Sequence, residues 1–115
     1  MFKQEIGDWK EYREYPNSIE VDLHHSEFGR REISYEEAMR NVWEETLSAL
    51  QSAYEKGLSY VIFTHGRFTS RPGRTTARSQ VRKLMRSKDT TPYIIKKECI
   101  QHPSVFVAAI RPVPS

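Results

Sequence analysis

Residues 60–66 have the sequence YVIFTHG, and the rest of the chain is organised around this stretch. Its first five residues are aromatic, β-branched or apolar, a composition typical of a buried strand. His65 and Gly66 follow directly, and glycine adopts backbone angles that are closed to other residues. We therefore expect a strand over 60–64 that ends in a tight loop.

The segment after this strand is strongly basic. From Gly66 to Lys88 there are eight Arg or Lys residues and no Asp or Glu, although the whole chain carries a net charge of only +3. Four apolar residues within it recur at helical spacing: Ala77, Val81, Leu84 and Met85. They predict a second helix over about 75–86. A strand that leads through a glycine loop into a basic helix start is a favourable place for phosphate.

The residues before the central stretch complete a βαβ unit. Residues 19–24 alternate between apolar and polar, which predicts a strand with one buried face. The same alternation puts Asp22 and His24 on one face, about 7 Å apart. A capping-box sequence at Ser34, followed by apolar residues at helical period, predicts a helix over 34–56. The strands 19–24 and 60–64 are then expected to be parallel.

Two further strands are predicted towards the end of the chain. Residues 93–100 fit a partly exposed strand, and the apolar run 105–110 fits a strand buried on both faces. The sum is an α/β domain of order βαβαββ, in which two helices cover a four-stranded mixed sheet as a two-layer α+β sandwich.

The domain is expected to span residues 19–112, between an N-terminal arm (1–18) and a C-terminal tail (113–115). In the arm, aromatic or apolar residues recur at every third position, at Ile6, Trp9 and Tyr12. This pattern fits a short amphipathic helix. It fits equally a tail that lays its aromatic side chains over the core or on a protein partner.

Composition sets the class of protein. A chain of 115 residues with 37% hydrophobic and 29% charged residues is expected to fold as one globular domain. The single cysteine, Cys99, cannot form an internal disulfide, which favours a reducing compartment. The chain shows neither a membrane-spanning apolar run nor a signal-peptide pattern at its start. We therefore expect a cytoplasmic protein that does not associate with membranes.

Topology predicts where a site would lie. In parallel α/β sheets, the loops that leave the carboxyl ends of the strands line the ligand crevice. Here these loops begin at His24 and His65, so Asp22, both histidines and the basic loop 66–74 are expected to share one rim.

Three segments resemble motifs of the small MutS-related (Smr) domain family. Residues 21–24, VDLH, resemble its Leu-Asp-x-His strand, and residues 33–39, ISYEEAM, its Thr-x-Glu-Glu-Ala helix start. Residues 64–66, THG, resemble the beginning of its His-Gly-x-Gly or Thr-Gly-x-Gly loop, and 78–85 look like its second helix. The resemblance covers about residues 19–112.

The resemblance implies a fold similar to the C-terminal domain of bacterial translation initiation factor three. It also implies nucleic-acid binding and, as in some members, endonuclease activity on DNA or RNA. Three departures fall on the predicted rim: His25 stands where the first motif is usually followed by glycine, Phe68 replaces the second glycine of the loop, and both loops are longer than is usual in the family. The altered glycine loop favours binding over cleavage.

The candidate catalytic residues are Asp22, His24 and His65. His24 is the candidate general base, because its ordinary pKa lies near neutral. Asp22 would orient it or hold Mg²⁺ or Mn²⁺, and His65 would act as an acid or orient a phosphate. No other cofactor is indicated, and a metal-free route would suit RNA. Each residue also has an interpretation without function: Asp22 as an ordinary exposed acid, His24 as a surface histidine, and His65 as a histidine in a turn.

Phosphate contact is assigned to the glycine loop and the helix that follows it. Guanidinium groups bind phosphate in bidentate fashion, a bare glycine backbone permits close approach, and an exposed aromatic ring stacks on an unpaired base. The candidate binding residues are Gly66, Arg67, Phe68, Arg71, Gly73, Arg74, Arg78 and Arg82.

Three functional hypotheses remain. The first is an Smr-like domain that binds nucleic acid and nicks it, and the second is a binding module without catalysis. The third is a protein-interaction domain whose arm, residues 1–18, docks a partner. His102 is expected to have no functional role, and Cys99 to be buried packing.

Overall fold

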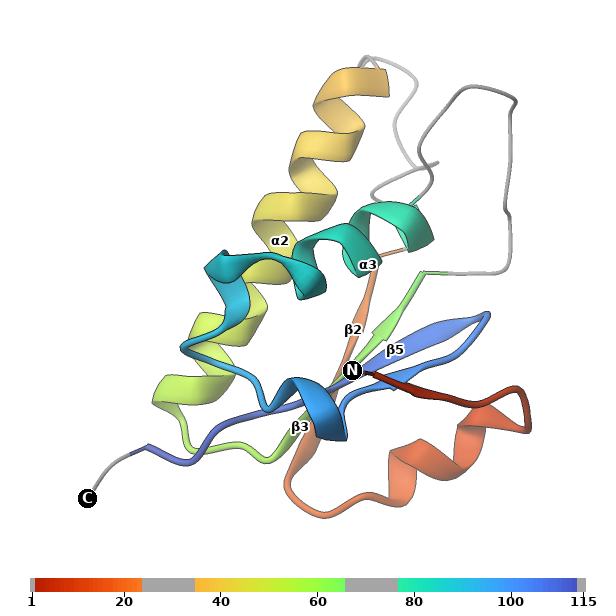
Figure 1. The fold of residues 1–115 in the computed structure, drawn as a ribbon, viewed down its shortest axis with the longest axis vertical. Coiled ribbons are helices and arrows are strands. Elements are labelled where there is room, and N and C mark those ends of the chain that lie inside the picture. Colours follow the sequence, from red (N-terminus) through yellow and green to blue (C-terminus); the bar gives the residue numbers. More distant parts are fainter. Residues whose placement is uncertain (1, 24–34, 66–76, 114–115) are drawn as a thin grey trace.

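The computed structural model of the chain describes residues 2–23, 35–65 and 77–113. The described residues form a mixed α/β fold with a five-stranded sheet, two α-helices and three short 3-10 helices (Figure 1). In chain order the elements are β1 (Lys3–Gln4), η1 (Trp9–Glu14), β2 (Ser18–Asp22), α2 (Tyr35–Glu55), β3 (Tyr60–Thr64), α3 (Ala77–Arg86), η2 (Lys88–Thr90), η3 (Lys96–Glu98), β4 (Ile100–Gln101) and β5 (Val105–Ala109). The expected four-stranded sheet and the order βαβαββ are wrong by one strand, because β1 adds a further strand at the start.

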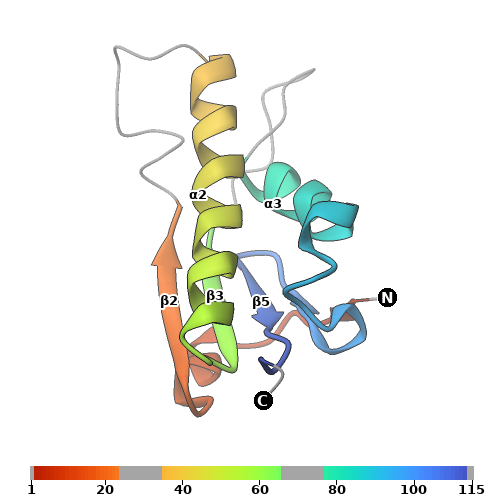
Figure 2. The same ribbon diagram turned by 90° about the vertical axis from the view of Figure 1, so that its left-hand side faces the viewer.

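The predicted βαβ unit is confirmed. Strands β2 and β3 lie side by side and are parallel, with Ser18 opposite Tyr60 and Asp22 opposite Thr64. The helix that connects them, α2, runs along both strands (Figure 2). It ends at Glu55, and Gly57 shortly after it lies in the left-handed region (φ 72°), where a residue without a Cβ is favoured.

The central strand of the sheet is β5. The strand order is β1-β4-β5-β3-β2, and β5 is antiparallel to both of its neighbours. All five of its residues are buried. Alternate side chains enter two different cores: Phe106 and Ala108 on one face, Val105 and Val107 on the other. The prediction of a strand buried on both faces is confirmed.

The larger core lies between the sheet and the two α-helices. Its helical side is formed by apolar residues of α2 and α3: Met39, Val42, Leu50, Ala53, Val81 and Met85. They pack with Phe63 and Phe106 of the sheet, and burial of each large apolar side chain stabilises the fold by about 1.5–3 kcal/mol. This core fixes α3 against the sheet and so determines where its arginines lie.

The N-terminal segment covers the opposite face of the sheet. Tyr12 of η1 is buried with Ile62, and Trp9 and Tyr15 pack beside it. Ile6 is 83% exposed, so the spacing of every third residue does not mark one buried face. Residues 9–14 of the arm form the 3-10 helix η1. Of the alternatives that the sequence left open, the structure shows the arm laying aromatic side chains over the core.

The predicted strand over 93–100 is wrong in its middle. Ile94 pairs with Ile110 as an isolated bridge, and pairing resumes where Ile100 lies opposite Val107. Between these two pairs, the segment predicted as a strand runs from residue 94 to residue 100. The segment opposite it runs only from residue 110 to residue 107, so the first has extra residues that cannot pair. The 3-10 turn η3 takes up the difference, and it leaves Cys99 buried in the larger core.

Candidate nucleic-acid interface

Only some of the predicted site residues lie in the described part of the chain. Those outside it are His24, Gly66, Arg67, Phe68, Arg71, Gly73 and Arg74. Those inside it are Asp22, His65, Arg78 and Arg82. The described ones come from three elements: the ends of β2 and β3 and the first two turns of α3.

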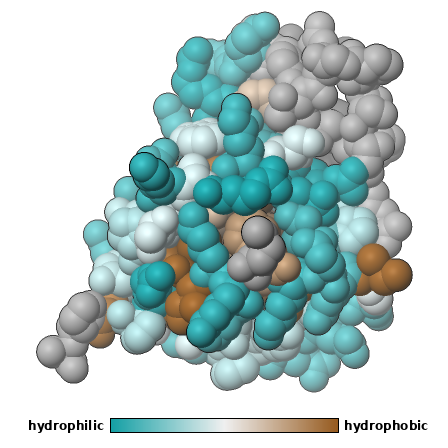
Figure 3. Space-filling view, in the orientation of Figure 1, coloured by the Kyte–Doolittle hydropathy of each residue, from teal (hydrophilic) through white to brown (hydrophobic). Residues whose placement is uncertain are grey.

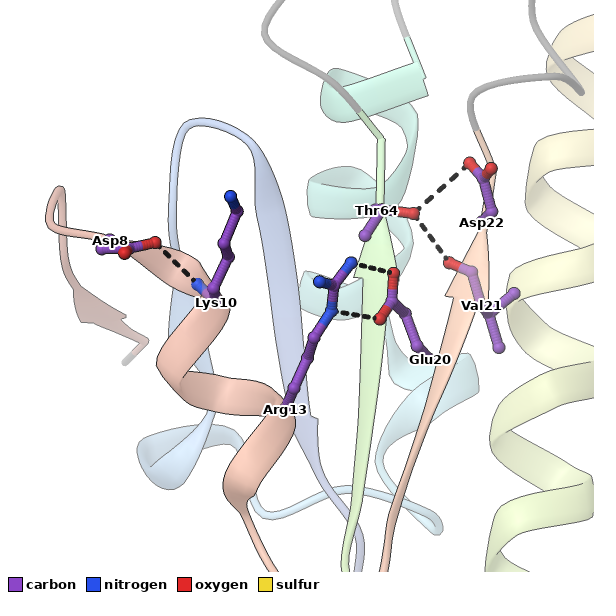
Figure 4. Close-up of polar contacts among 7 residues, drawn as sticks. All are labelled: Asp8, Lys10, Arg13, Glu20, Val21, Asp22 and Thr64. Atoms are coloured by element: carbon purple, nitrogen blue, oxygen red, sulfur yellow. Dashed lines mark hydrogen bonds and ion pairs between the residues drawn. The ribbon is translucent and has the colours of Figure 1, made fainter.

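Asp22 ends the edge strand β2 and is exposed. The hydroxyl of Thr64, directly opposite in the parallel pair, donates towards Asp22 Oδ1 at 3.3 Å and lies 3.4 Å from the Val21 carbonyl oxygen (Figure 4). Strand alternation puts Asp22 on the same face as Glu20, which binds Arg13 of η1. The Asp22 carboxylate therefore belongs to the face that η1 covers.

His65 lies at the same end of the sheet but on its other face. Alternation along β3 puts Thr64 with Ile62, on the η1 side, and His65 with Phe63, on the helix side. The ring is only 2% exposed, and its backbone N–H donates to the Ser104 carbonyl at 3.2 Å. Asp22 and His65 thus share the predicted end of the sheet, while their side chains point to opposite faces.

Arg78 and Arg82 both reach the turn that joins β4 to β5. Arg78 Nη1 donates to the Pro103 carbonyl at 3.2 Å, and Arg82 Nη2 donates to the His102 carbonyl at 3.3 Å. The two arginines are four residues apart, so they occupy one face of α3. The helix puts the two guanidinium groups beside the strand end that carries His65.

The charge on α3 has no acidic partner among the described residues. The helix carries four basic residues and no acid, and the surface above it is strongly hydrophilic (Figure 3). In the described ranges the one ion pair joins Arg13 to Glu20, so Arg78, Arg82 and Arg86 have no carboxylate within ion-pair distance there. Desolvation lowers the pKa of Arg82, and the neighbouring charges of Arg78 and Arg86 lower it further.

Arg82 also has an unmet hydrogen-bonding group. Its side chain is half-buried, and its Nε is fully buried without a hydrogen-bond acceptor among the described residues. A buried donor without an acceptor destabilises the folded protein. A cation in this environment gains more from an added anion than one that water already solvates.

His102, for which the sequence predicts no functional role, is fully buried at this site. Its Nδ1 accepts a hydrogen bond from the Ser104 N–H at 2.9 Å, and its Nε2 lies 2.7 Å from the Gly7 carbonyl oxygen. The available sequence signal was the position of His102 between the predicted strands 93–100 and 105–110. The contact with Gly7 had none, because the two residues are 95 positions apart.

The described residues hold no group of three His, Cys, Asp or Glu side chains that could bind a metal ion. Asp22 therefore remains a single candidate ligand for Mg²⁺ or Mn²⁺ in this part of the chain. No helix in the described ranges is both long enough and apolar enough to cross a membrane.

Comparison of the chain with models of protein families, with curated proteins and with solved structures finds no match. The candidate site is accordingly defined by its own geometry: two arginines of α3 that have no carboxylate partner in the described part of the chain, hydrogen-bonded to the 102–104 turn, beside a strand end.

Proposed function

We propose that this protein binds nucleic acid through the phosphate backbone, with Arg78, Arg82 and Arg86 of α3 as the principal described contacts. The observation that carries the proposal is a row of arginines at intervals of four residues without a carboxylate partner in the described ranges. At 1.5 Å rise per residue this row is about 12 Å long. A linear array of guanidinium groups suits a ligand with repeated phosphates.

The energetics of Arg82 favour an anionic ligand over simple solvation. A half-buried cation between two other cations is unfavourable in the free protein. A phosphate placed over the row would offset both the desolvation and the mutual repulsion. The basic loop 66–74, outside the described residues, would extend the same charge along the chain.

The resemblance to the Smr family supports the same class of ligand. Arg78 stands where that family has the basic residue of its second helix, and the proposal includes a fold of the kind found in the C-terminal domain of translation initiation factor three. Phosphodiester cleavage stays a prediction. His24, its candidate base, lies outside the described residues, and the side chains of Asp22 and His65 point to opposite faces. The geometry therefore supports nucleic-acid binding more strongly than it supports cleavage.

The test is binding of fluorescein-labelled oligonucleotides by fluorescence anisotropy over a range of salt concentrations. Single-stranded RNA and duplex DNA are measured in parallel, because the proposal covers both. The double variant Arg78→Met/Arg82→Met keeps most of the side-chain volume and removes two charges. Losing two phosphate contacts should reduce the slope of log Kd against log salt by about 1.5–2 and weaken binding to both probes.

A matched control is Arg13→Met, which removes an arginine that already has a carboxylate partner in Glu20. It should bind both probes like the unaltered protein. Equal slopes for the double variant and the unaltered protein, or no binding to either probe, would contradict the proposed function.

A further inference from the structure

The 102–104 turn connects three separate parts of the molecule. Each of its three backbone carbonyls accepts a hydrogen bond from a different residue. The His102 carbonyl accepts from Arg82, the Pro103 carbonyl from Arg78, and the Ser104 carbonyl from the backbone N–H of His65. The conformation of this turn therefore determines where both guanidinium groups lie relative to the end of β3.

The buried imidazole of His102 holds this turn together through a hydrogen bond within it. The Ser104 N–H donates to Nδ1 at 2.9 Å, so Nδ1 carries no proton and Nε2 carries one. Nε2–H then donates to the Gly7 carbonyl at 2.7 Å, which anchors the ring to the N-terminal segment. The ring is fully buried, and Tyr12 packs edge-on against it with centroids 6.1 Å apart. The His102 side chain thus connects the turn to Gly7 and Tyr12 of the N-terminal segment.

We propose that His102 is a positioning residue for nucleic-acid binding: it holds the 102–104 turn in the form that orients Arg78 and Arg82. This inference depends on the proposed function of α3. Long arginine side chains lose conformational freedom on binding, and carbonyls that restrain them beforehand reduce that loss. His102 does not touch the phosphates itself. It acts through the turn.

Two substitutions separate the two hydrogen bonds of the ring. His102→Asn retains an oxygen that accepts from the N–H two residues on, as in an Asx turn, but is too short to reach Gly7. His102→Gln keeps a donor near the position of Nε2, for the Gly7 carbonyl, but does not favour the short turn bond to Ser104. If the turn is what matters, His102→Asn should bind within about twofold of the unaltered protein, and His102→Gln about tenfold more weakly.

A merely structural role predicts a different result. In that case binding would follow stability, so the variant with the lower urea midpoint would also be the weaker binder. The proposal predicts instead that binding follows the Ser104 hydrogen bond, whichever variant is the more stable. Equal affinities for His102→Asn and His102→Gln, or weaker binding by His102→Asn, would overturn it.

A double-mutant cycle links the effect to the arginines. His102→Gln should weaken binding in the unaltered background and have no further effect when Arg78 and Arg82 are already methionine. The same fold-loss in both backgrounds would show that His102 acts elsewhere and would overturn the inference. If the double variant Arg78→Met/Arg82→Met binds nucleic acid like the unaltered protein, the proposed function of α3 is wrong. That result differs from an equal fold-loss in both backgrounds, which would overturn only the role of His102.

Discussion

Replacing Arg82 by methionine should weaken nucleic-acid binding without lowering stability. Methionine retains an unbranched side chain of similar length and has a comparable helix propensity, so the packing of α3 is largely preserved. What changes is the charge and the hydrogen bonding of a half-buried guanidinium. Most substitutions of half-buried side chains destabilise a protein, so a variant that keeps or gains stability would be an unusual result that tests the reasoning.

The expected magnitude follows from the contacts of Arg82. The bond that is lost, from Nη2 to the His102 carbonyl, is 3.3 Å long, and such a bond stabilises by about 1 kcal/mol. Against it, the buried Nε without an acceptor costs about 1–3 kcal/mol. Repulsion from Arg78 and Arg86, four residues away on each side, costs about 0.3 kcal/mol for each pair. The free energy of unfolding should therefore rise by about 0.5–2.5 kcal/mol.

Urea unfolding followed by circular dichroism measures this quantity through the midpoint at constant m value. The control is Arg13→Met, which removes an arginine that binds Glu20 through two nitrogens and lies 4.6 Å from the centre of the Trp9 ring. It should lower the midpoint. If Arg82→Met lowers the midpoint as much as Arg13→Met does, Arg82 stabilises the fold, and its charge and buried Nε do not destabilise the free protein as proposed.

Two further predictions concern stability. Burial raises the pKa of the Cys99 thiol from 9.0 to about 11, so the unfolded chain releases this proton first, and stability should fall as pH rises from 9 to 11. Cys99→Ala should lack this loss of about 2–3 kcal/mol, and a constant stability difference between the two proteins across that range would disprove it. Asn17 has φ 56°, and its side-chain amide donates to the Gly57 carbonyl at 2.8 Å. Asn17→Ala should cost about 1–2 kcal/mol and Asn17→Gly less, because glycine tolerates this φ, and a more stable alanine variant would count against this account.

Local pattern was sufficient for the elements with strong periodicity. The apolar run 60–64 is β3, and the βαβ order predicted the parallel pairing of β2 with β3. The residues around η3 could not be predicted in this way. A continuous strand and a strand interrupted by a three-residue turn have the same apolar positions at their ends, and only the register against β5 distinguishes them.

Contacts between distant parts of the chain account for the other differences. β1 has two exposed polar residues, and it pairs with β4 nearly a hundred positions later. The basic character of α3 could be predicted from composition, whereas the burial of Arg82 depends on the 102–104 turn. The separation of Asp22 from His65 depends on which residues of β2 and β3 lie opposite each other, and this register has no local signature.

Contact between the α3 arginines and nucleic acid can be observed at the arginine side chains themselves. Arginine Nε–Hε signals of ¹⁵N-labelled protein are followed by NMR while a short single-stranded RNA, and separately a short duplex DNA, is added to saturation. The Arg78 and Arg82 signals should shift along the titration with at least one probe, while the signal of Arg13, which is bound by Glu20, should stay in place. Saturable binding of a probe that leaves both the Arg78 and Arg82 signals unmoved would contradict the proposed contact.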